Sequence, residues 1–275
     1  MYGLRYTIPF KTLSDISCEI RLEEKDFTGE PMELIAGGNP IVIDTNTGDL
    51  TTPIRPSGAT IQVYGSDYLQ DLYASDPQGV RVTLLVDGNV NWLGYMTPDT
   101  FSQDFSSPEF VYEVECVSAL STLKLIDFDI ENDFVSFLQI IKRARDLAGY
   151  DKLYLTNSIR ANSGSFYDLN IATANFFDEL GEAMTYYEVL EEIAKYAGCC
   201  FTPYQDDLYL LDYKAISSGF NLYEKYDGDT KTLVTVASSD TVANYRGTGA
   251  KLSRIAGKNK ASVICSMYEI KDILP

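Results

Sequence analysis

The chain has 275 residues, 45% of them hydrophobic, with 22 lysines and arginines against 40 aspartates and glutamates. The formal net charge of −18 argues against sequence-independent binding to nucleic acid, because such binding depends on cations that release condensed counterions. It argues equally against docking onto an anionic membrane, while the apolar content predicts a packed core of one large domain or two modest ones.

Histidine is absent from the sequence, which limits the chemistry that the chain can perform. Its absence removes histidine-based triads, zinc sites with imidazole ligands and the commonest general base. The start of the chain does not resemble a signal peptide, and no apolar run reaches the roughly 20 residues of a membrane span. We expect the cysteines to be buried free thiols in a reducing compartment; they are Cys18, Cys116, Cys199, Cys200 and Cys265.

Apolar and polar residues alternate through the first part of the chain, with the period of half-buried strands. The alternation is clear in residues 4–10 and 18–22. The clearest hairpin covers residues 80–96, where Asp87-Gly88 supplies a turn that tolerates positive φ. Further strands are predicted over residues 32–36, 41–44, 59–64 and 112–116, with Gly-Gly-Asn-Pro at 37–40 separating the first two. These short strands predict an antiparallel β-barrel or sandwich for residues 1–127.

The pattern changes after residue 127, and residues 128–230 are predicted to form a small α+β domain. Asp133 is expected to cap a helix that Gly149 ends, and residues 172–180 are expected to form a second, short helix. Residues 157–170 are polar and predict a loop. The predicted fold class is therefore α+β, mostly β, with the helical domain inserted between strand-rich regions.

The strongest local signals lie in residues 184–213. Thr185 and Glu188 have the spacing of a capping box, an apolar stripe follows, and Gly198 is expected to end the helix. Residues 199–201 are then predicted to begin the first strand of a hairpin, residues 205–207 to form its turn, and residues 208–213 to form its second strand. This predicts a short amphipathic helix followed by a β-hairpin.

Residues 231–275 are expected to return to strand structure, with strands at 232–237 and 261–270. These strands would be the start of a second barrel. Between these two runs, residues 244–260 are rich in glycine and cations. A final strand would have few local partners. We therefore expect either that neighbouring subunits complete it or that the chain is a fragment of a longer protein.

Four groups of residues suggest chemistry, and each fails a test of spacing. Asp127, Asp129, Glu131 and Asp133 alternate like calcium ligands, but the sixth position is Asn132 and the twelfth is Leu138, where an EF-hand has Gly and Glu. The stretch 247–251 lacks the glycine and lysine spacing of a phosphate loop. The stretch 163–165 is not a nucleophile elbow, and Cys199 and Cys200 are expected to occupy opposite faces of a strand.

Two further possibilities stay open from the residues alone. Exposed Trp92 and Tyr95, or the tyrosines at 186, 187, 196, 204, 209 and 213, could stack on sugars or on partner proteins. A pair among the 40 acidic residues could act in a carboxylate-dependent hydrolase. Because nothing marks such a pair as desolvated, we predict that the chain is not an enzyme and has no catalytic, cofactor-binding or metal-binding residues.

The order of five segments resembles a known family. They are residues 6–10 (YTIPF), 91–98 (NWLGYMTP), 110–120 (FVYEVECVSAL), 187–199 (YEVLEEIAKYAGC) and 208–213 (LYLLDY). In this order they resemble the tail proteins of bacteriophages and prophages of Bacteroides-type hosts, in the baseplate hub class. The resemblance covers most of the chain through order and texture, without an invariant signature.

The resemblance implies a structural virion protein with no catalytic residues. It implies a β-barrel domain interrupted by an α/β insertion, and a trimeric ring that joins the tail tube to the spike or fibre apparatus. The expected partners are other copies and other tail proteins, and the expected location is the virion tail, assembled in the host cytoplasm. Acidic residues facing the passage would let DNA slide without binding. The distal tail protein, a carbohydrate-binding β module and a hydrolase are the alternatives.

Overall fold

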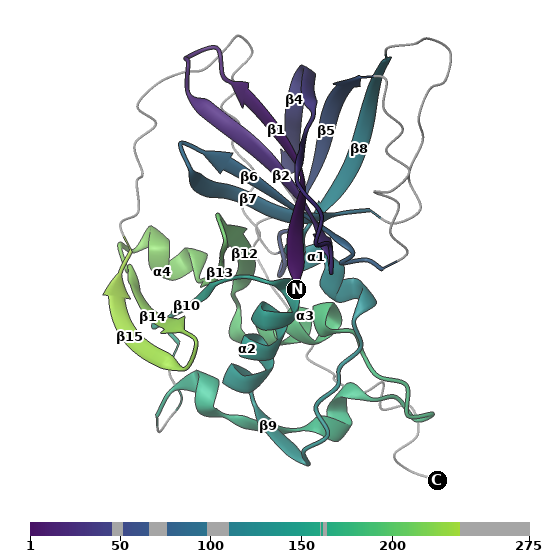
Figure 1. Ribbon diagram of the computed structural model, residues 1–275. Helices are drawn as coiled ribbons and strands as arrows, with labels where there is room; N and C mark the ends of the chain where they lie inside the picture. The colour runs from purple at the N-terminus through teal and green to yellow at the C-terminus, as the bar shows by residue number, and fades with distance from the viewer. Residues whose placement is uncertain (46–51, 66–75, 98–109, 160, 162–163, 237–275) are drawn as a thin grey trace.

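The computed structural model describes residues 1–45, 52–65, 76–97, 110–159, 161 and 164–236. Within these residues the chain forms an eight-stranded sheet, a five-stranded sheet and a two-stranded one. The eight-stranded sheet occupies the upper half of Figure 1, and the helices and the other sheets lie below it. The longest described helices have 12 residues each, and none of the described helices is long and apolar enough to cross a bilayer.

The eight-stranded sheet is antiparallel except at one edge, where the short strand β3 runs parallel to β1. Its hydrogen-bonded order is β3-β1-β2-β6-β7-β8-β5-β4. The strands are β1 (Tyr2–Lys11), β2 (Ser17–Lys25), β3 (Met32–Glu33), β4 (Ile35–Thr45), β5 (Ser57–Gly65), β6 (Val80–Val86), β7 (Asn89–Met96) and β8 (Phe110–Ser118).

This sheet rolls around one core, but the strands described do not close into a hydrogen-bonded barrel. β3 and β4 stand at opposite ends of the strand order, although only Leu34 separates them in the chain. The Leu34 amide donates to the Thr7 carbonyl oxygen at 2.8 Å, and the Leu34 side chain is buried in the core. One continuous segment therefore reaches both ends of the sheet and forms a narrow seam in place of a full ladder.

The predicted strand alternation is confirmed in β1, β2 and β8, where alternate residues point into the core. In β8, for example, Glu113 and Glu115 are exposed between buried neighbours. The β6–β7 hairpin is also confirmed, with Asp87 at φ 49° and Gly88 at φ 78° in the turn. The mostly β, α+β fold class follows from the sequence as expected.

The second part of the molecule begins at Ala119 and is built on the sheet β12-β13-β10-β14-β15, in which only the β10–β13 pair is parallel. Strands β9 and β11 form the separate two-stranded sheet. The elements are α1 (Ala119–Thr122), η2 (Leu123–Leu125), β9 (Phe134–Ser136), α2 (Phe137–Ala148), β10 (Lys152–Thr156), η3 (Phe166–Asp168), β11 (Asn170–Ala172), η4 (Thr173–Phe176), α3 (Tyr186–Ala197), β12 (Cys200–Tyr204), β13 (Asp207–Leu211), α4 (Tyr213–Ser217), β14 (Leu222–Asp227) and β15 (Thr230–Thr235).

The predicted capping box at the start of α3 is confirmed. Thr185 Oγ1 accepts from the Glu188 amide at 3.3 Å, and Glu188 Oε2 accepts from the Thr185 amide at 2.8 Å. Gly198 ends the helix with φ 67°, and Gln205 at φ 59° turns the β12–β13 hairpin. The strand β13 ends at Leu211, however, and Tyr213 begins α4 instead of continuing the strand.

The predicted start of α2 is wrong. Ser136, not Asp133, is the N-cap: Ser136 Oγ accepts from the Gln139 amide at 3.2 Å, and Gln139 Oε1 accepts from the Ser136 amide at 3.0 Å. This reciprocal pair satisfies two amides, whereas a lone carboxylate cap satisfies one, and Phe134–Ser136 is free to form β9. Gly149 ends α2 with φ 85°, as predicted.

Two other local predictions differ from the structure. The short helix expected over residues 172–180 is reduced to the single turn η4, Thr173–Phe176. The run 37–40, expected to separate two strands, lies inside β4, where the pairing with β5 shifts register between Ala36 and Ile41. A strand can accommodate Gly and Pro at such an irregularity, because the ladder is interrupted there.

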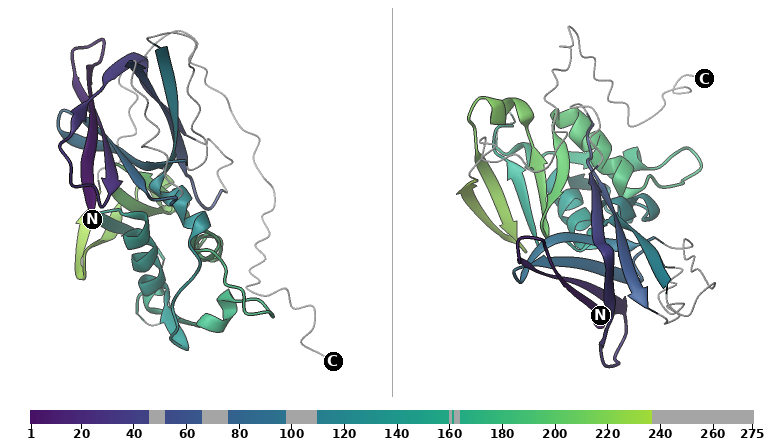
Figure 2. Two further views of the ribbon diagram at one scale, coloured as in Figure 1. Left: turned by 45° about the vertical axis from the view of Figure 1, so that its right-hand side comes forward. Right: turned by 90° about the horizontal axis from the view of Figure 1, so that it is seen from above.

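Strand β7 joins the two parts, because its two faces enter different cores. Trp92 points into the rolled sheet, whereas Leu93 and Tyr95 belong to the core of the second part. Ile54, between β4 and β5, bridges to Phe201 of β12 and is also buried in the second core. Figure 2 shows the helices and the five-stranded sheet packed against the base of the rolled sheet.

β15 covers most of the first predicted C-terminal strand and pairs with β14 along its whole length. The second predicted strand, residues 261–270, lies outside the described residues, as does the cation-rich run 244–260. The domain boundaries near residues 127 and 230 and the second barrel stay predictions.

Replacing Thr185 with Ala removes the hydroxyl that caps α3. We expect the free energy of unfolding to fall by about 1 kcal/mol, measured by urea denaturation. Thr185→Ser keeps the acceptor and serves as the control, with a change of a few tenths of a kcal/mol. Equal losses in the two variants would contradict a capping role.

Replacing Gly94 with Ala introduces a Cβ that would collide with the indole of Trp92 and the carbonyl oxygen of Val117. Both neighbours belong to the packed sheet, so we expect a loss of about 3 kcal/mol or more, as for severe overpacking. Gly38→Ala is the matched control, since its Cβ would meet nothing within 4 Å. Thermal unfolding of the two variants compares them directly.

Candidate functional site

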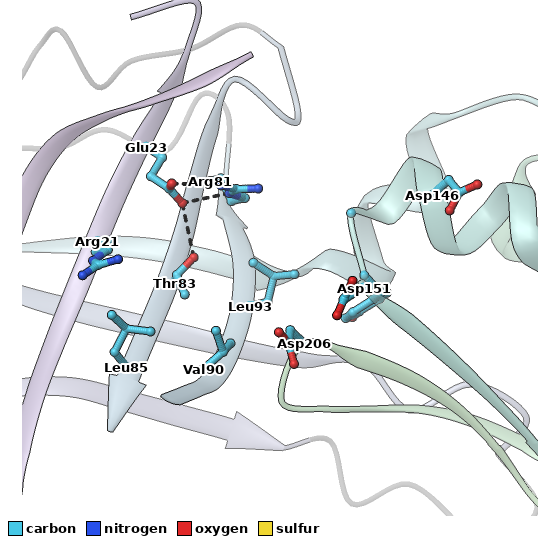
Figure 3. Close-up of a pocket in the computed structure, with 12 residues that line it drawn as sticks. Arg21, Glu23, Arg81, Thr83, Leu85, Val90, Leu93, Asp146, Asp151 and Asp206 are labelled. Atoms are coloured by element: carbon cyan, nitrogen blue, oxygen red, sulfur yellow. Dashed lines mark hydrogen bonds and ion pairs between the residues drawn. The ribbon is translucent and has the colours of Figure 1, made fainter. Parts of the chain in front are cut away.

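A cavity of about 510 Å³ lies between the rolled sheet and the second part of the molecule (Figure 3). One wall comes from β2, β6 and β7. The other comes from the end of α2, the residues that follow it and the β12–β13 turn. We call this cavity the junction cleft. Its lining residues are Arg21, Glu23, Arg81, Thr83, Leu85, Val90, Leu93, Asp146, Gly149, Tyr150, Asp151 and Asp206.

The wall on the rolled sheet carries a charge pair. Glu23 accepts from Arg81 Nε and Nη2, both at 2.8 Å, and from the Thr83 hydroxyl at 3.4 Å. Burial lowers the pKa of the Arg81 guanidinium, but the hydrogen bonds and charge of Glu23 outweigh burial and raise it. Arg81 also lies over the Tyr2 ring, 4.7 Å from its centroid. This wall is therefore held by a two-pronged ion pair.

The opposite wall carries three carboxylates. Asp146 accepts from Arg145 Nε and Nη2 at 2.8 and 2.6 Å, and Asp151 accepts from Lys152 Nζ at 2.5 Å. Asp206 has no cationic partner among the residues that the structure describes. The Asp206 carbonyl oxygen accepts from the Asp151 amide at 2.7 Å, which ties the turn to the end of α2.

The lining groups of the cleft are mostly engaged in structural contacts. Two of the three carboxylates on the acidic wall, and Glu23 opposite, contact cations. The Tyr150 hydroxyl accepts from the buried Leu120 amide at 3.0 Å, and burial raises the pKa of Tyr150. Each wall is therefore held by ion pairs of its own, and Leu85 and Val90 add apolar surface to the wall of the rolled sheet.

The acidic residues that alternate between Asp127 and Asp133 do not converge on one site, and two of them make structural contacts. Asp129 accepts from Arg143 Nη2 and from the Tyr186 hydroxyl, each at 2.5 Å; the hydrogen bond from Arg143 lowers the pKa of Asp129. Asp127 bridges to Thr185 ahead of α3. In the described ranges no group of three or more acidic or cysteine side chains could hold a metal ion.

Trp92 and Tyr95 are buried, with 6% and 2% of their surfaces exposed, so neither can stack on a sugar. Trp92 Nε1 donates to Ser57 Oγ at 2.9 Å. The strand alternation alone could not show this burial, because it predicts one covered face and β7 has two. Of the remaining tyrosines, Tyr196 and Tyr204 are more than half exposed, whereas Tyr186 is fully buried.

The other singled-out residues have local roles or lie outside the description. Ser165 Oγ accepts from the Tyr167 amide at 3.3 Å at the start of η3, while Ser163 and residues 247–251 fall outside the described residues. Cys199 and Cys200 are both buried free thiols. Burial raises the pKa of Cys199 to about 12, which keeps it an unreactive thiol at neutral pH.

The outer face of the rolled sheet exposes a row of apolar side chains. Ile35 of β4 pairs with Tyr64 of β5, and Tyr64 pairs with Val111 of β8. Directly paired residues point to the same face of a sheet. These three side chains are 65%, 37% and 49% exposed, and we call them the apolar row.

Three hydrogen bonds connect the ends of α1 and α2 to their surroundings: those of Tyr95 and Gln78 reach α2 from the side of the rolled sheet, and that of Tyr150 joins α1 to the end of α2. Tyr95 Oη donates to the Ala148 carbonyl oxygen at 3.1 Å, and Tyr150 Oη accepts from the Leu120 amide. Gln78 Nε2 donates to the Leu147 carbonyl oxygen at 2.7 Å. These bonds satisfy backbone groups at the ends of two helices, which otherwise lack partners. Sequence patterns gave no signal for them, because each bond joins residues far apart in the chain.

Replacing Tyr150 with Phe tests the bond between α1 and the end of α2. The change leaves the buried Leu120 amide without its acceptor, and we expect the free energy of unfolding to fall by about 1–3 kcal/mol. Tyr204→Phe is the control, because Tyr204 is 64% exposed, and it should change stability by less than about 0.5 kcal/mol. Chemical denaturation that gives equal values for both variants would show that the Tyr150 hydroxyl is dispensable.

Comparisons with known proteins give partial structural similarities alone. No family model matches the sequence, and no curated protein matches it. Among solved structures, the 43 kDa tail protein of prophage MuSo2 from Shewanella oneidensis has 17% identity and a TM-score of 0.38, over 62% of this chain and 54% of that one. The tail protein from Neisseria meningitidis MC58 has 15% identity and a TM-score of 0.39, over 65% and 50%. The chain thus matches about half the length of each tail protein, and neither similarity assigns it to a family.

Proposed function

We propose that this chain is a structural component of a phage or prophage tail, of the baseplate hub class, that assembles as a ring between the tail tube and the tip apparatus. The sequence resemblance, through the order of its five segments, supports the class. The apolar row is the observation that carries the assembly. Neighbouring apolar side chains that are exposed on a sheet form a surface that another subunit can bury.

The occupant of the apolar row is another copy of the chain. The charge of −18 disfavours random association of copies, so a stable contact between copies needs exposed apolar area. Ile35, Tyr64 and Val111 supply it on three adjacent strands, with Glu113 and Glu115 further along the same face of β8. The seam at Leu34 and the junction with α2 keep this sheet rigid, and a rigid sheet can hold a fixed angle between subunits.

The distal tail protein of a phage is the second candidate, since it is another ring component with a β-barrel. The number of subunits separates the two: the resemblance to hubs implies three. We propose further that acidic residues line the central passage of the ring, through which DNA would slide. A ring lumen lined mainly by Lys and Arg would contradict it, because such a wall would bind DNA.

Assembly is tested by native mass spectrometry and sedimentation over a range of protein concentrations. We expect ring-sized oligomers that grow with concentration. Ile35→Lys combined with Val111→Lys should shift the assembly toward monomers by tenfold or more in dissociation constant, about 1.4 kcal/mol or more. Each lysine would bury a charge in an apolar contact.

The control is Leu233→Lys, which adds one lysine at a side chain that is 59% exposed on the other sheet, and each single variant of the apolar row is compared with it at equal charge. Leu233→Lys should leave the oligomer distribution unchanged. A chain that stays monomeric at its highest soluble concentration, or that binds a glycan on an array as a monomer, would overturn the ring and favour the carbohydrate-binding module.

A further inference from the structure

The junction cleft is large enough for a small ligand, and it is separate from the apolar row. Its volume of about 510 Å³ lies within the range of ligand pockets, about 300–1,000 Å³. The apolar row belongs to β4, β5 and β8, whereas the walls of the cleft come from β2, β6, β7 and the second part of the molecule. A ligand in the cleft is therefore independent of the proposed ring.

The wall on the rolled sheet has one guanidinium group that can take a ligand. Arg21 Nε donates to Glu19 at 2.6 Å, and within the described residues no acceptor meets the two terminal nitrogens of Arg21. The Arg21 side chain is 44% exposed, so these N–H groups are accessible. Two N–H groups of a guanidinium match the two oxygens of a carboxylate. Arg81, by contrast, already holds Glu23 through Nε and Nη2.

The opposite wall has one carboxylate that can take a cation. Arg145 holds Asp146, and Lys152 holds Asp151, but in the part of the chain that the structure describes no cation pairs with Asp206. The amide of Asp151 fixes the backbone of Asp206 at the β12–β13 turn. The turn therefore presents an uncompensated carboxylate to the cleft.

These two groups lie on opposite sides of apolar surface. Figure 3 shows Arg21 on one side of the cleft and Asp206 on the other, with Leu85, Val90 and Leu93 between them. Each ion pair printed for the lining residues that the structure describes stays within one wall, and none joins the two walls. A guanidinium and a carboxylate of opposite charge are thus kept apart by an open and partly apolar space.

Two hydrogen bonds oppose closure of the cleft by movement of its walls. Tyr95 Oη donates to the Ala148 carbonyl oxygen at 3.1 Å, and Gln78 Nε2 donates to the Leu147 carbonyl oxygen at 2.7 Å. Both bonds connect the rolled sheet with the end of α2, next to the cleft residue Gly149. Because the walls are held in this way, a ligand with a charge at each end is the simplest link between Arg21 and Asp206.

We propose that the junction cleft binds a ligand in which a carboxylate and an ammonium group are joined by an aliphatic stem. The carboxylate accepts from the terminal nitrogens of Arg21, and the ammonium donates to Asp206. The stem lies against Leu85, Val90 and Leu93, as lysine stems do on apolar surface while their charged ends keep polar partners. Two sources have this chemistry: the C-terminal lysine of a peptide chain and free lysine.

Three ligands with the same stem test the site on the full chain by titration calorimetry. Nα-acetyl-lysine carries both charges, Nα-acetyl-lysinamide carries only the ammonium, and Nα-acetyl-norleucine carries only the carboxylate. We expect the first to bind about tenfold tighter than either of the others, because it alone forms a charge-assisted contact with both walls. Equal affinities for the three, or no saturation by Nα-acetyl-lysine at about 50 mM, overturn the proposal.

Two variants assign the ends of the ligand. Arg21→Gln should remove the advantage of Nα-acetyl-lysine over its amide, and Asp206→Asn should remove its advantage over Nα-acetyl-norleucine. Lys11→Gln and Asp15→Asn are the matched controls, because they make the same changes of charge in an exposed ion pair elsewhere; they should keep all three affinities. Folded cleft variants that bind like the unmodified chain contradict the site, and if either variant unfolds, the three ligands on the unmodified chain still decide.

Free lysine distinguishes the two sources. Its α-ammonium lies next to its carboxylate and would be repelled by Arg21, whereas the acylated nitrogen of a C-terminal lysine carries no charge. Tighter binding of Nα-acetyl-lysine therefore indicates the end of a peptide chain, and tighter binding of free lysine indicates the free amino acid. Either result supports the site only with the losses expected for Arg21→Gln and Asp206→Asn.

Discussion

The structure depends on hydrogen bonds that buried tyrosines make to helix ends at and beside the junction between its two parts. Tyr95 of β7 donates to the Ala148 carbonyl oxygen at the end of α2, and Tyr150 accepts from an amide at the start of α1. Helix ends have backbone groups without intrahelical partners, and leaving them dry and unpaired is costly. The rolled sheet is therefore attached to α2 by a directional bond as well as by apolar packing, and α1 is attached to the end of α2 in the same way.

The elements predicted best are those whose signals are local and agree with each other. The capping box of Thr185 and Glu188 and the αL residue Gly198 define both ends of α3 through contacts within the helix itself. The start of α2 was missed for a physical reason. Asp133 and Ser136 are both good N-caps by residue type, and only the reciprocal bond with Gln139 favours Ser136. The ends of strands and the lengths of short helices depend on pairing with residues that are distant in the chain. The periodicity of the sequence carries no information about such pairing.

The candidate surfaces were predictable in composition but not in position. The tyrosine-rich tract indicated contact surface, yet Tyr186 is fully buried and Tyr204 is exposed, and their spacing does not separate the two. Trp92 has the strongest aromatic signal in the chain but fills the rolled core above Gly94. The junction cleft could not be found from the sequence, since its walls come from segments at least 53 residues apart. Burial on both faces of a strand is a tertiary property.

The placement of charge connects stability with assembly. Several arginines are used inside the molecule: Arg81 holds Glu23, and Arg145, 5% exposed, holds Asp146. With these cations engaged in ion pairs, much of the remaining surface charge of residues 1–236 is negative. A surface of one sign repels its own copies except where it is neutral or where a basic partner covers it. The apolar row provides a surface of the first kind, so the same charge asymmetry that opposes unspecific association of copies favours contacts at that row.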